Sequence, residues 1–144
     1  MPVASAYVET SVLGAYYCPE PLSMAAETAL RAVDVPVIST LTEVEFTSLV
    51  ARKQRLRELK ARQANEVLQL FERHVQEGFF RRVPLGTELL LHAARLIRLM
   101  SSSLRTLDAL HLATAMSENL PLLTSDRALA QAAKRHQADA ILLR

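Results

Sequence analysis

Short apolar segments alternate with helical segments along the whole chain, and this alternation restricts the possible fold more than any other feature. Apolar runs that predict strands fall at residues 3–8, 35–38, 79–85, 122–125 and 139–143. Between them, apolar residues recur at the three- and four-residue spacing of amphipathic helices. Strands that alternate with helices form a parallel sheet covered by helices on both faces. The sequence therefore predicts a three-layer α/β/α fold.

The length of 144 residues is that of one domain, and no internal repeat, low-complexity tract or linker divides the chain. We expect a single domain over residues 1–144. No apolar run approaches the roughly 20 residues that a membrane-spanning helix needs, and residues 1–6 lack the features of a secretory signal. A cytoplasmic protein is the expectation, and the single cysteine, Cys18, agrees with a reducing compartment.

The glycine and cysteine content excludes several kinds of site. Gly14, Gly78 and Gly86 are the only glycines and lie far apart, so neither a P-loop nor a dinucleotide-binding loop can form. One cysteine can build neither a disulfide framework nor a cysteine-based zinc site. We therefore expect any bound metal ion to be held by oxygen atoms.

A helix predicted from about residue 106 carries an acid at its start. Thr106 is the predicted N-cap, which places Asp108 in the first turn, where its carboxylate meets the positive end of the helix dipole. Apolar residues at helical spacing bury the remainder of this helix. His111 lies among them, and no second histidine stands at ligand spacing. We therefore expect His111 to pack and hydrogen-bond inside the core rather than to bind a metal.

Three further acids lie where predicted elements meet. Glu9 follows the first strand, Glu45 lies in the helix after the second strand, and Asp126 follows the fourth strand. Sites in parallel sheets gather at the carboxyl ends of the strands. Carboxylates that converge there repel one another unless a cation lies between them, and Mg²⁺ and Mn²⁺ prefer oxygen ligands. The acids together predict a divalent-metal site.

Each acid also has a purely structural interpretation. Asp108 can serve as a dipole partner of its helix, and Asp126 can cap the helix that follows it. Thr42 and Glu45 have the spacing of a capping box, and Glu9 can be a surface residue. Only the combination of the four acids favours a site over these alternatives.

The basic residues indicate an anionic partner. The formal net charge is only +2, but fourteen of the seventeen basic residues are arginine, which binds phosphate through two hydrogen bonds at once. Six basic residues lie between Arg52 and Arg62, with Glu58 as the only acid among them. A solvated helix face is the default interpretation of this run, and a surface that contacts RNA is the alternative.

Four segments resemble, in chain order, the signature segments of PIN-domain proteins, and they look most like those of the VapC toxins of bacterial toxin–antitoxin pairs. The segments are residues 7–13 (YVETSVL), Ser39 followed by Glu45, residues 105–115 (RTLDALHLATA) and residues 123–129 (LTSDRAL). The resemblance covers essentially the full chain, and the third and fourth segments are the most specific.

The resemblance implies a metal-dependent endoribonuclease that hydrolyses RNA phosphodiester bonds in an acidic cleft, with Mg²⁺ or Mn²⁺ as its cofactor. It also implies five parallel strands in the order 3-2-1-4-5, a homodimer, and a cognate antitoxin whose tail enters the cleft. The implied metal-binding quartet is Glu9, Glu45, Asp108 and Asp126, assisted by Thr10 and by Thr124 or Ser125.

The first acid departs from the family pattern, because Glu9 stands where PIN proteins usually have aspartate. The extra methylene lengthens the side chain, while Mg²⁺ tolerates little departure from bonds of ~2.0–2.1 Å. We expect the strand end to be set back in compensation. The alternative is a catalytically impaired PIN-like module that binds RNA or a protein.

A phosphoacceptor signalling domain and a phosphatase with an aspartate nucleophile agree less well with the sequence than a nuclease does. A phosphoacceptor domain needs a lysine at a strand end, whereas Lys53, Lys60 and Lys134 all fall in predicted helices. A phosphatase with an aspartate nucleophile needs two aspartates around one residue after the first strand, and residues 9–11 read Glu-Thr-Ser. A nuclease that acts on DNA stays open, because phosphate chemistry does not distinguish the sugar.

Overall fold

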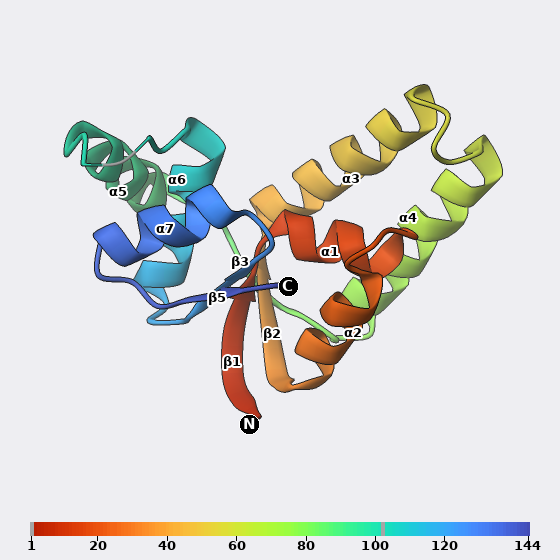
Figure 1. The fold of residues 1–144 in the computed structure, drawn as a ribbon, viewed down its shortest axis with the longest axis horizontal. Coiled ribbons are helices and arrows are strands. Elements are labelled where there is room, and N and C mark those ends of the chain that lie inside the picture. The colour runs from red at the N-terminus through yellow and green to blue at the C-terminus, as the bar shows by residue number, and fades with distance from the viewer. Residues whose placement is uncertain (1, 102) are drawn as a thin grey trace.

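The computed structural model describes residues 2–101 and 103–144. Its elements are β1 (Val3–Val8), α1 (Thr10–Tyr17), α2 (Ser23–Arg31), β2 (Val33–Ser39), α3 (Thr40–Arg55), α4 (Ala61–Gln76), β3 (Arg81–Val83), α5 (Thr87–Arg98), α6 (Thr106–Ser117), β4 (Leu122–Thr124), α7 (Arg127–Arg135) and β5 (Ala140–Leu142). The strands form one parallel sheet in the order β3-β2-β1-β4-β5. Helices α1 to α4 lie on one side of it and α5 to α7 on the other (Figure 1). The predicted fold class and strand order are confirmed.

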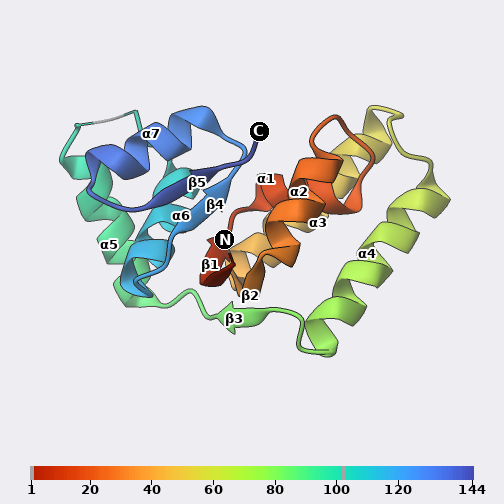
Figure 2. The ribbon, with the colours of Figure 1, turned by 60° about the horizontal axis from the view of Figure 1, so that its bottom comes forward.

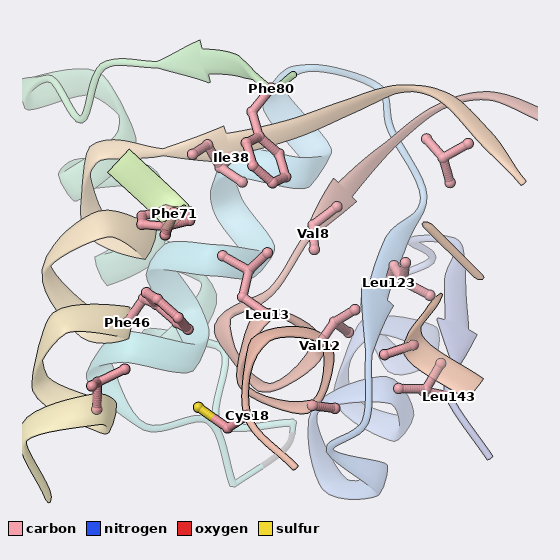
Figure 3. Packing of buried hydrophobic residues seen from close by; sticks show 14 of the residues in the cluster. Val8, Val12, Leu13, Cys18, Ile38, Phe46, Phe71, Phe80, Leu123 and Leu143 are labelled. Carbon is pink, nitrogen blue, oxygen red and sulfur yellow. The ribbon is translucent and has the colours of Figure 1, made fainter. Parts of the chain in front are cut away.

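Two apolar clusters hold the layers together, and alternate strand residues enter opposite clusters. Val8 of β1 packs toward α1 to α4, whereas its neighbour Tyr7 packs toward α5 to α7. Leu122 and Leu123 of β4 divide in the same way. Figure 3 shows the first cluster, in which Leu13 lies near the middle of the packed side chains and Phe46 lies close to Phe71. Burial on both faces explains why these strands read as continuous apolar runs.

The basic run lies on the hairpin that α3 and α4 form at the outer side of their layer (Figure 2). Arg52 and Arg55 are exposed, while Lys53 lies 3.4 Å from Glu58 and 3.8 Å from Glu20. Arg62 is paired with Glu66 at 3.1 Å. The run is therefore mostly solvated, over the end of α3, the following turn and the start of α4, and Arg52 and Arg55 are its exposed arginines on α3.

Two predicted helix starts are wrong by a few residues. Thr106 is the first residue of α6 rather than its N-cap, which is Arg105 and forms no side-chain cap. The capping box of α3 joins Ser39 to Thr42, and not Thr42 to Glu45, because α3 begins directly where β2 ends. Glu45 consequently lies beyond the first turn of α3, where it is available for other contacts.

Strand β3 is shorter than the predicted segment 79–85 and lies at the sheet edge, where the implied strand order 3-2-1-4-5 places it. Pro84 cannot donate a hydrogen bond to the neighbouring strand, so pairing ends at Val83. Arg81 and Arg82 are exposed and bind Glu118 and Glu43. Across residues 2–101 and 103–144, none of the helices has both the length and the apolarity to cross a membrane.

Candidate active site

The predicted acids reach one edge of the sheet from four separate segments. Glu9 directly follows β1, Asp126 follows β4, Glu45 lies on the helix after β2, and Asp108 is the third residue of α6. The amide of Glu9 donates to the carbonyl oxygen of Leu123 at 3.0 Å, which holds the ends of β1 and β4 side by side. The carboxyl edge of the central strands therefore gathers the quartet, as the topology rule predicts.

Hydroxyl groups hold the carboxylate of Glu9, a residue that is only 8% exposed. Its Oε2 atom accepts hydrogen bonds from Thr124 Oγ1 at 2.8 Å and from Ser11 Oγ. These two hydroxyls accept in turn from the backbone amides of Asp126 and Ser125, each at 3.0 Å. The longer glutamate side chain is thus used to reach donors on β1–α1 and on β4.

Glu45 is held in a similar way by residues of β1–α1 and of α6. Its Oε1 atom accepts a hydrogen bond from Thr10 Oγ1 at 2.8 Å and contacts Nε2 of the buried His111. Burial opposes ionisation of Glu45, but the hydrogen bond and attraction of His111 and the Thr10 hydroxyl outweigh it, so the pKa of this carboxyl lies below its usual value. Glu45 is therefore ionised at neutral pH.

The two aspartates lie at helix starts. Asp126 is the N-cap of α7, and its Oδ1 accepts from the amide of Leu129 at 3.1 Å. Asp108, half-buried in the first turn of α6, accepts no hydrogen bond from the described residues. Burial, followed by the negative charges of Asp126, Glu9 and Glu45, raises the pKa of Asp108. Repulsion of this kind indicates that the four carboxylates share one region.

The predicted hydroxyls do not all contact the acids. Thr10 and Thr124 donate to the glutamates, whereas Ser125 contributes its backbone amide and its hydroxyl forms no bond with an acid in the part of the chain that is described. Ser11, which the sequence analysis did not select, donates to Glu9 instead. His111 is buried and hydrogen-bonded, as expected, but its contact with Glu45 was missed. The sequence did contain one signal that His111 lies near the acids, because it follows Asp108 by three residues and therefore lies on the same face of the helix.

The donor chemistry of the site fits a hard divalent cation. Each glutamate, and also Asp126, has one oxygen that accepts hydrogen bonds and a second that accepts none from residues 2–101 and 103–144. A cation between these oxygens would relieve the repulsion that acts on Asp108. Among the described residues, no three acid, histidine or cysteine side chains already lie close enough together to hold one ion. Binding would have to draw the carboxylates closer.

A cleft of about 350 Å³ lies beside the serines that surround Glu9. Ser11, which donates to Glu9, and Ser125 line it together with Arg52 and Lys53 of α3 and the acids Glu20 and Glu58. None of the four site acids is among its lining residues, so the cleft connects the partners of Glu9, and not the acids themselves, to the start of the basic run.

Comparisons with known proteins agree on the fold. The family model for the PIN domain matches residues 6–135. Similar solved structures include FitAcB from Neisseria gonorrhoeae, which is 20% identical with a TM-score of 0.71 over 94% of this chain and 96% of that one. A toxin–antitoxin complex from Klebsiella pneumoniae is 17% identical with a TM-score of 0.71 over 96% and 98% of the two chains. VapC20 from Mycobacterium tuberculosis, a sarcin–ricin loop cleaving toxin, is 17% identical with a TM-score of 0.69 over 88% and 94%. No curated protein matches the sequence.

Proposed function

The chain belongs to the PIN-domain family, and from that premise we propose that it is a metal-dependent endoribonuclease and the toxin of a toxin–antitoxin pair. The observation that carries the proposal is the gathering of four carboxylates from four segments at one edge of the sheet, where burial and then the charges of the other three acids raise the pKa of Asp108. The fold it shares with VapC20 and with a toxin–antitoxin complex supports the same assignment.

In this proposal Glu9, Glu45, Asp108 and Asp126 would hold Mg²⁺ or Mn²⁺. When bound, the cation supplies positive charge to the phosphodiester and acidifies water at the site. Thr10 and Thr124 keep the two glutamates in place through the hydrogen bonds at 2.8 Å. Oδ1 of Asp126 accepts a hydrogen bond from the amide of Leu129 in α7, which leaves Oδ2 for the cation.

The substrate proposed for this site is single-stranded RNA. The cleft that Ser11 and Ser125 line also contains Arg52, an exposed arginine that can bind phosphate through two hydrogen bonds. Lys53, at the same wall, shares its charge with Glu20 and Glu58, so Arg52 is the stronger candidate for the RNA backbone. Unpaired bases are the parts of RNA that proteins read most easily, which favours a loop or single strand.

A homodimer and a cognate antitoxin belong to the same proposal. Large apolar side chains are exposed on α5, just after it, and at the start of α6, namely Leu90, Leu91, Ile97, Leu99, Met100 and Leu107. Met100 is 84% exposed and Leu99 is 66% exposed, values that favour a second copy as the cover of this face. Light scattering should give twice the mass of the 16.0 kDa chain, and a monomer would contradict the dimer.

The alternative, a catalytically impaired PIN-like module, has one observation in its favour. Among the described acids, no three lie close enough together to hold one ion. Glu9, which stands in place of the usual aspartate, already accepts hydrogen bonds from two hydroxyl groups. A module of this kind would bind RNA or a protein without cleaving RNA.

The test is metal-dependent cleavage by antitoxin-free protein. A mixed oligoribonucleotide pool is incubated with Mg²⁺ or Mn²⁺, and then with a chelator, using wild type, Asp108→Asn and the control Asp34→Asn. Asp34 is exposed at the beginning of β2, at the opposite end of that strand from the site. Asp108→Asn should lower cleavage by at least about 100-fold, as expected when a preorganised electrostatic group is lost, while Asp34→Asn retains it.

Equal cleavage by wild type and Asp108→Asn would contradict the assignment. If all three proteins are inert and Mn²⁺ does not raise their thermal stability, the alternative of an impaired binding module is supported instead.

A further inference from the structure

We propose that His111 and Tyr7 are positioning residues of the proposed nuclease, which orient Glu45 through a continuous buried hydrogen-bond chain so that one carboxylate oxygen faces the cation. The proposal rests on the proposed function, and it adds two residues that the acidic quartet does not include. Neither residue touches the substrate or the cation; both act through Glu45.

His111 connects the two helices that carry acids. It lies on α6 three residues after Asp108, so both side chains project from the same face of that helix. The residue is 1% exposed, and its two ring nitrogens are both engaged, Nε2 with Glu45 Oε1 and Nδ1 with Tyr7 Oη at 2.7 Å. A histidine with both nitrogens occupied is a support for a ligand rather than a ligand itself.

Tyr7 extends the chain from His111 back to the start of α3. The residue is fully buried in β1, and its Oη atom lies 2.8 Å from Ser39 Oγ and 3.3 Å from Thr42 Oγ1. Ser39 and Thr42 form the capping box of α3, the helix that carries Glu45. The hydrogen-bond chain thus begins and ends on one helix and passes through β1 and α6 between.

The hydrogen bonds of this chain are complete along its whole length. A carboxylate oxygen of Glu45 accepts, so the hydrogen of the first bond lies on Nε2 of His111. The second bond joins Nδ1 of His111 to Tyr7 Oη, and the third joins Tyr7 Oη to Ser39 Oγ. Among the described residues, no buried side-chain nitrogen or oxygen atom lacks a hydrogen-bond partner, and this includes every member of the chain.

The consequence for Glu45 is that its two oxygens differ. Oε1 is held by two donors, Thr10 and His111, while Oε2 accepts no hydrogen bond from any residue of the described chain. With Oε1 held, the carboxylate cannot rotate freely, and Oε2 is the oxygen presented to a cation. Outer partners that orient a metal ligand typically change metal affinity or activity by about 10–100-fold when removed.

A buried Tyr–His pair could also serve stability alone, and the molecule contains a matched pair for comparison. Tyr17 Oη lies 2.6 Å from Nδ1 of His74, between α1 and α4. Within the described residues, the aromatic rings around Tyr17 are those of Tyr16, Phe46, Phe71 and His74, away from the four acids. Tyr17→Phe removes a hydroxyl from a Tyr–His hydrogen bond as Tyr7→Phe does. It serves as the structural control.

The experiment measures binding of Mn²⁺ alone by calorimetry, thermal stability, and the kcat and KM for the oligoribonucleotide pool. The variants are Tyr7→Phe, His111→Leu, His111→Gln and Tyr17→Phe. His111→Leu should weaken Mn²⁺ binding by about 10–100-fold and lower kcat with an unchanged KM for RNA. Tyr7→Phe should weaken it several-fold, and His111→Gln should restore most of the affinity because its amide can still donate to Glu45. Tyr17→Phe should lose stability without loss of Mn²⁺ affinity.

The possible failures are distinguishable. If Tyr7→Phe and His111→Leu lose thermal stability but bind Mn²⁺ and turn over RNA like wild type, the two residues are structural and the positioning role is refuted. If wild type itself neither binds Mn²⁺ nor cleaves RNA, the proposed nuclease function fails, and the positioning role fails with it.

Discussion

The two glutamates and the two aspartates of the acidic site are held by different means. Glu9 and Glu45 each accept two side-chain hydrogen bonds on one oxygen, mostly from residues distant in the chain. Asp126 caps its own helix and Asp108 lies in the first turn of its helix, where the backbone supplies the favourable field. We refer to these as the glutamate side and the aspartate side.

The difference follows from the length of the side chains. A glutamate has one more rotatable bond than an aspartate, so it needs additional donors to keep one orientation. An aspartate at a helix start is positioned by local backbone geometry. The glutamate side should therefore be sensitive to changes in neighbouring side chains, whereas the aspartate side should be sensitive chiefly to loss of its own charge.

The largest expected effect is the loss of cleavage when Asp126, on the aspartate side, is replaced. Two replacements distinguish the role of its charge from its role as a helix cap. Asp126→Asn keeps an N-cap of equal quality, so stability should be unchanged while cleavage falls on the order of 100-fold. Asp126→Ala should lose cleavage equally and also about 1 kcal/mol of stability. RNA cleavage and urea unfolding of both variants provide the check. Cleavage retained in Asp126→Asn would leave Asp126 with a capping role only.

The next effect concerns the unusual length of Glu9. Glu9→Asp introduces the residue typical of the family, but the shorter side chain should lose hydrogen bonds from Thr124 and Ser11. We expect about 1 kcal/mol less stability from the lost hydrogen bonding, and cleavage lowered by about tenfold because the carboxylate is less well oriented. Glu27→Asp, on the surface of α2, is the control. Faster cleavage by Glu9→Asp would instead identify Glu9 as an impairment.

A smaller effect is expected when one donor to Glu45 is removed. Thr10→Val preserves shape and leaves His111 to hold Oε1, so cleavage should fall only about three- to tenfold, at the low end of effects from outer partners. Thr10→Ser keeps the hydroxyl and should behave like wild type. If Thr10→Val cleaves like wild type in a kinetic assay, a single donor is enough for Glu45.

The smallest effect is a difference in the pH dependence of stability between the two sides. The pKa of Asp108 is raised on folding by burial and by neighbouring acids, so the folded protein binds more protons and stability falls as pH rises above about 3.9, the unfolded pKa. Glu45, whose pKa is lowered despite burial, adds stability at neutral pH that disappears as pH falls below about 4.3.

Neutral replacements should therefore act in opposite directions in chelated protein at pH 7. Asp108→Asn should raise the melting temperature, and Glu45→Gln should lower it, each on the order of 1–4 °C. Both differences should shrink as the pH is lowered toward 3 in a calorimetric series. Shifts of the same sign would show that the two sides do not differ electrostatically.

The fold was predictable to a large extent because its signals are local. Apolar runs separated by helical segments indicate a parallel sheet covered by helices on both faces. The strand order came from the resemblance of four segments to PIN-domain proteins rather than from periodicity. Helix starts were misplaced by a few residues where a cap could form at neighbouring positions, as with Ser39 and Thr42.

The sequence by itself determined where the acids lie within their elements. Asp108 falls in the first turn of a buried helix and Asp126 at the end of an apolar strand, and both positions depend only on adjacent residues. The tertiary structure alone decided which groups hold the glutamates. Tyr7 and His111 are 104 positions apart, and Glu45 and His111 are 66 apart. Such pairs meet only because the sheet places β1 beside both β2 and β4, and local periodicity contains no information about that arrangement.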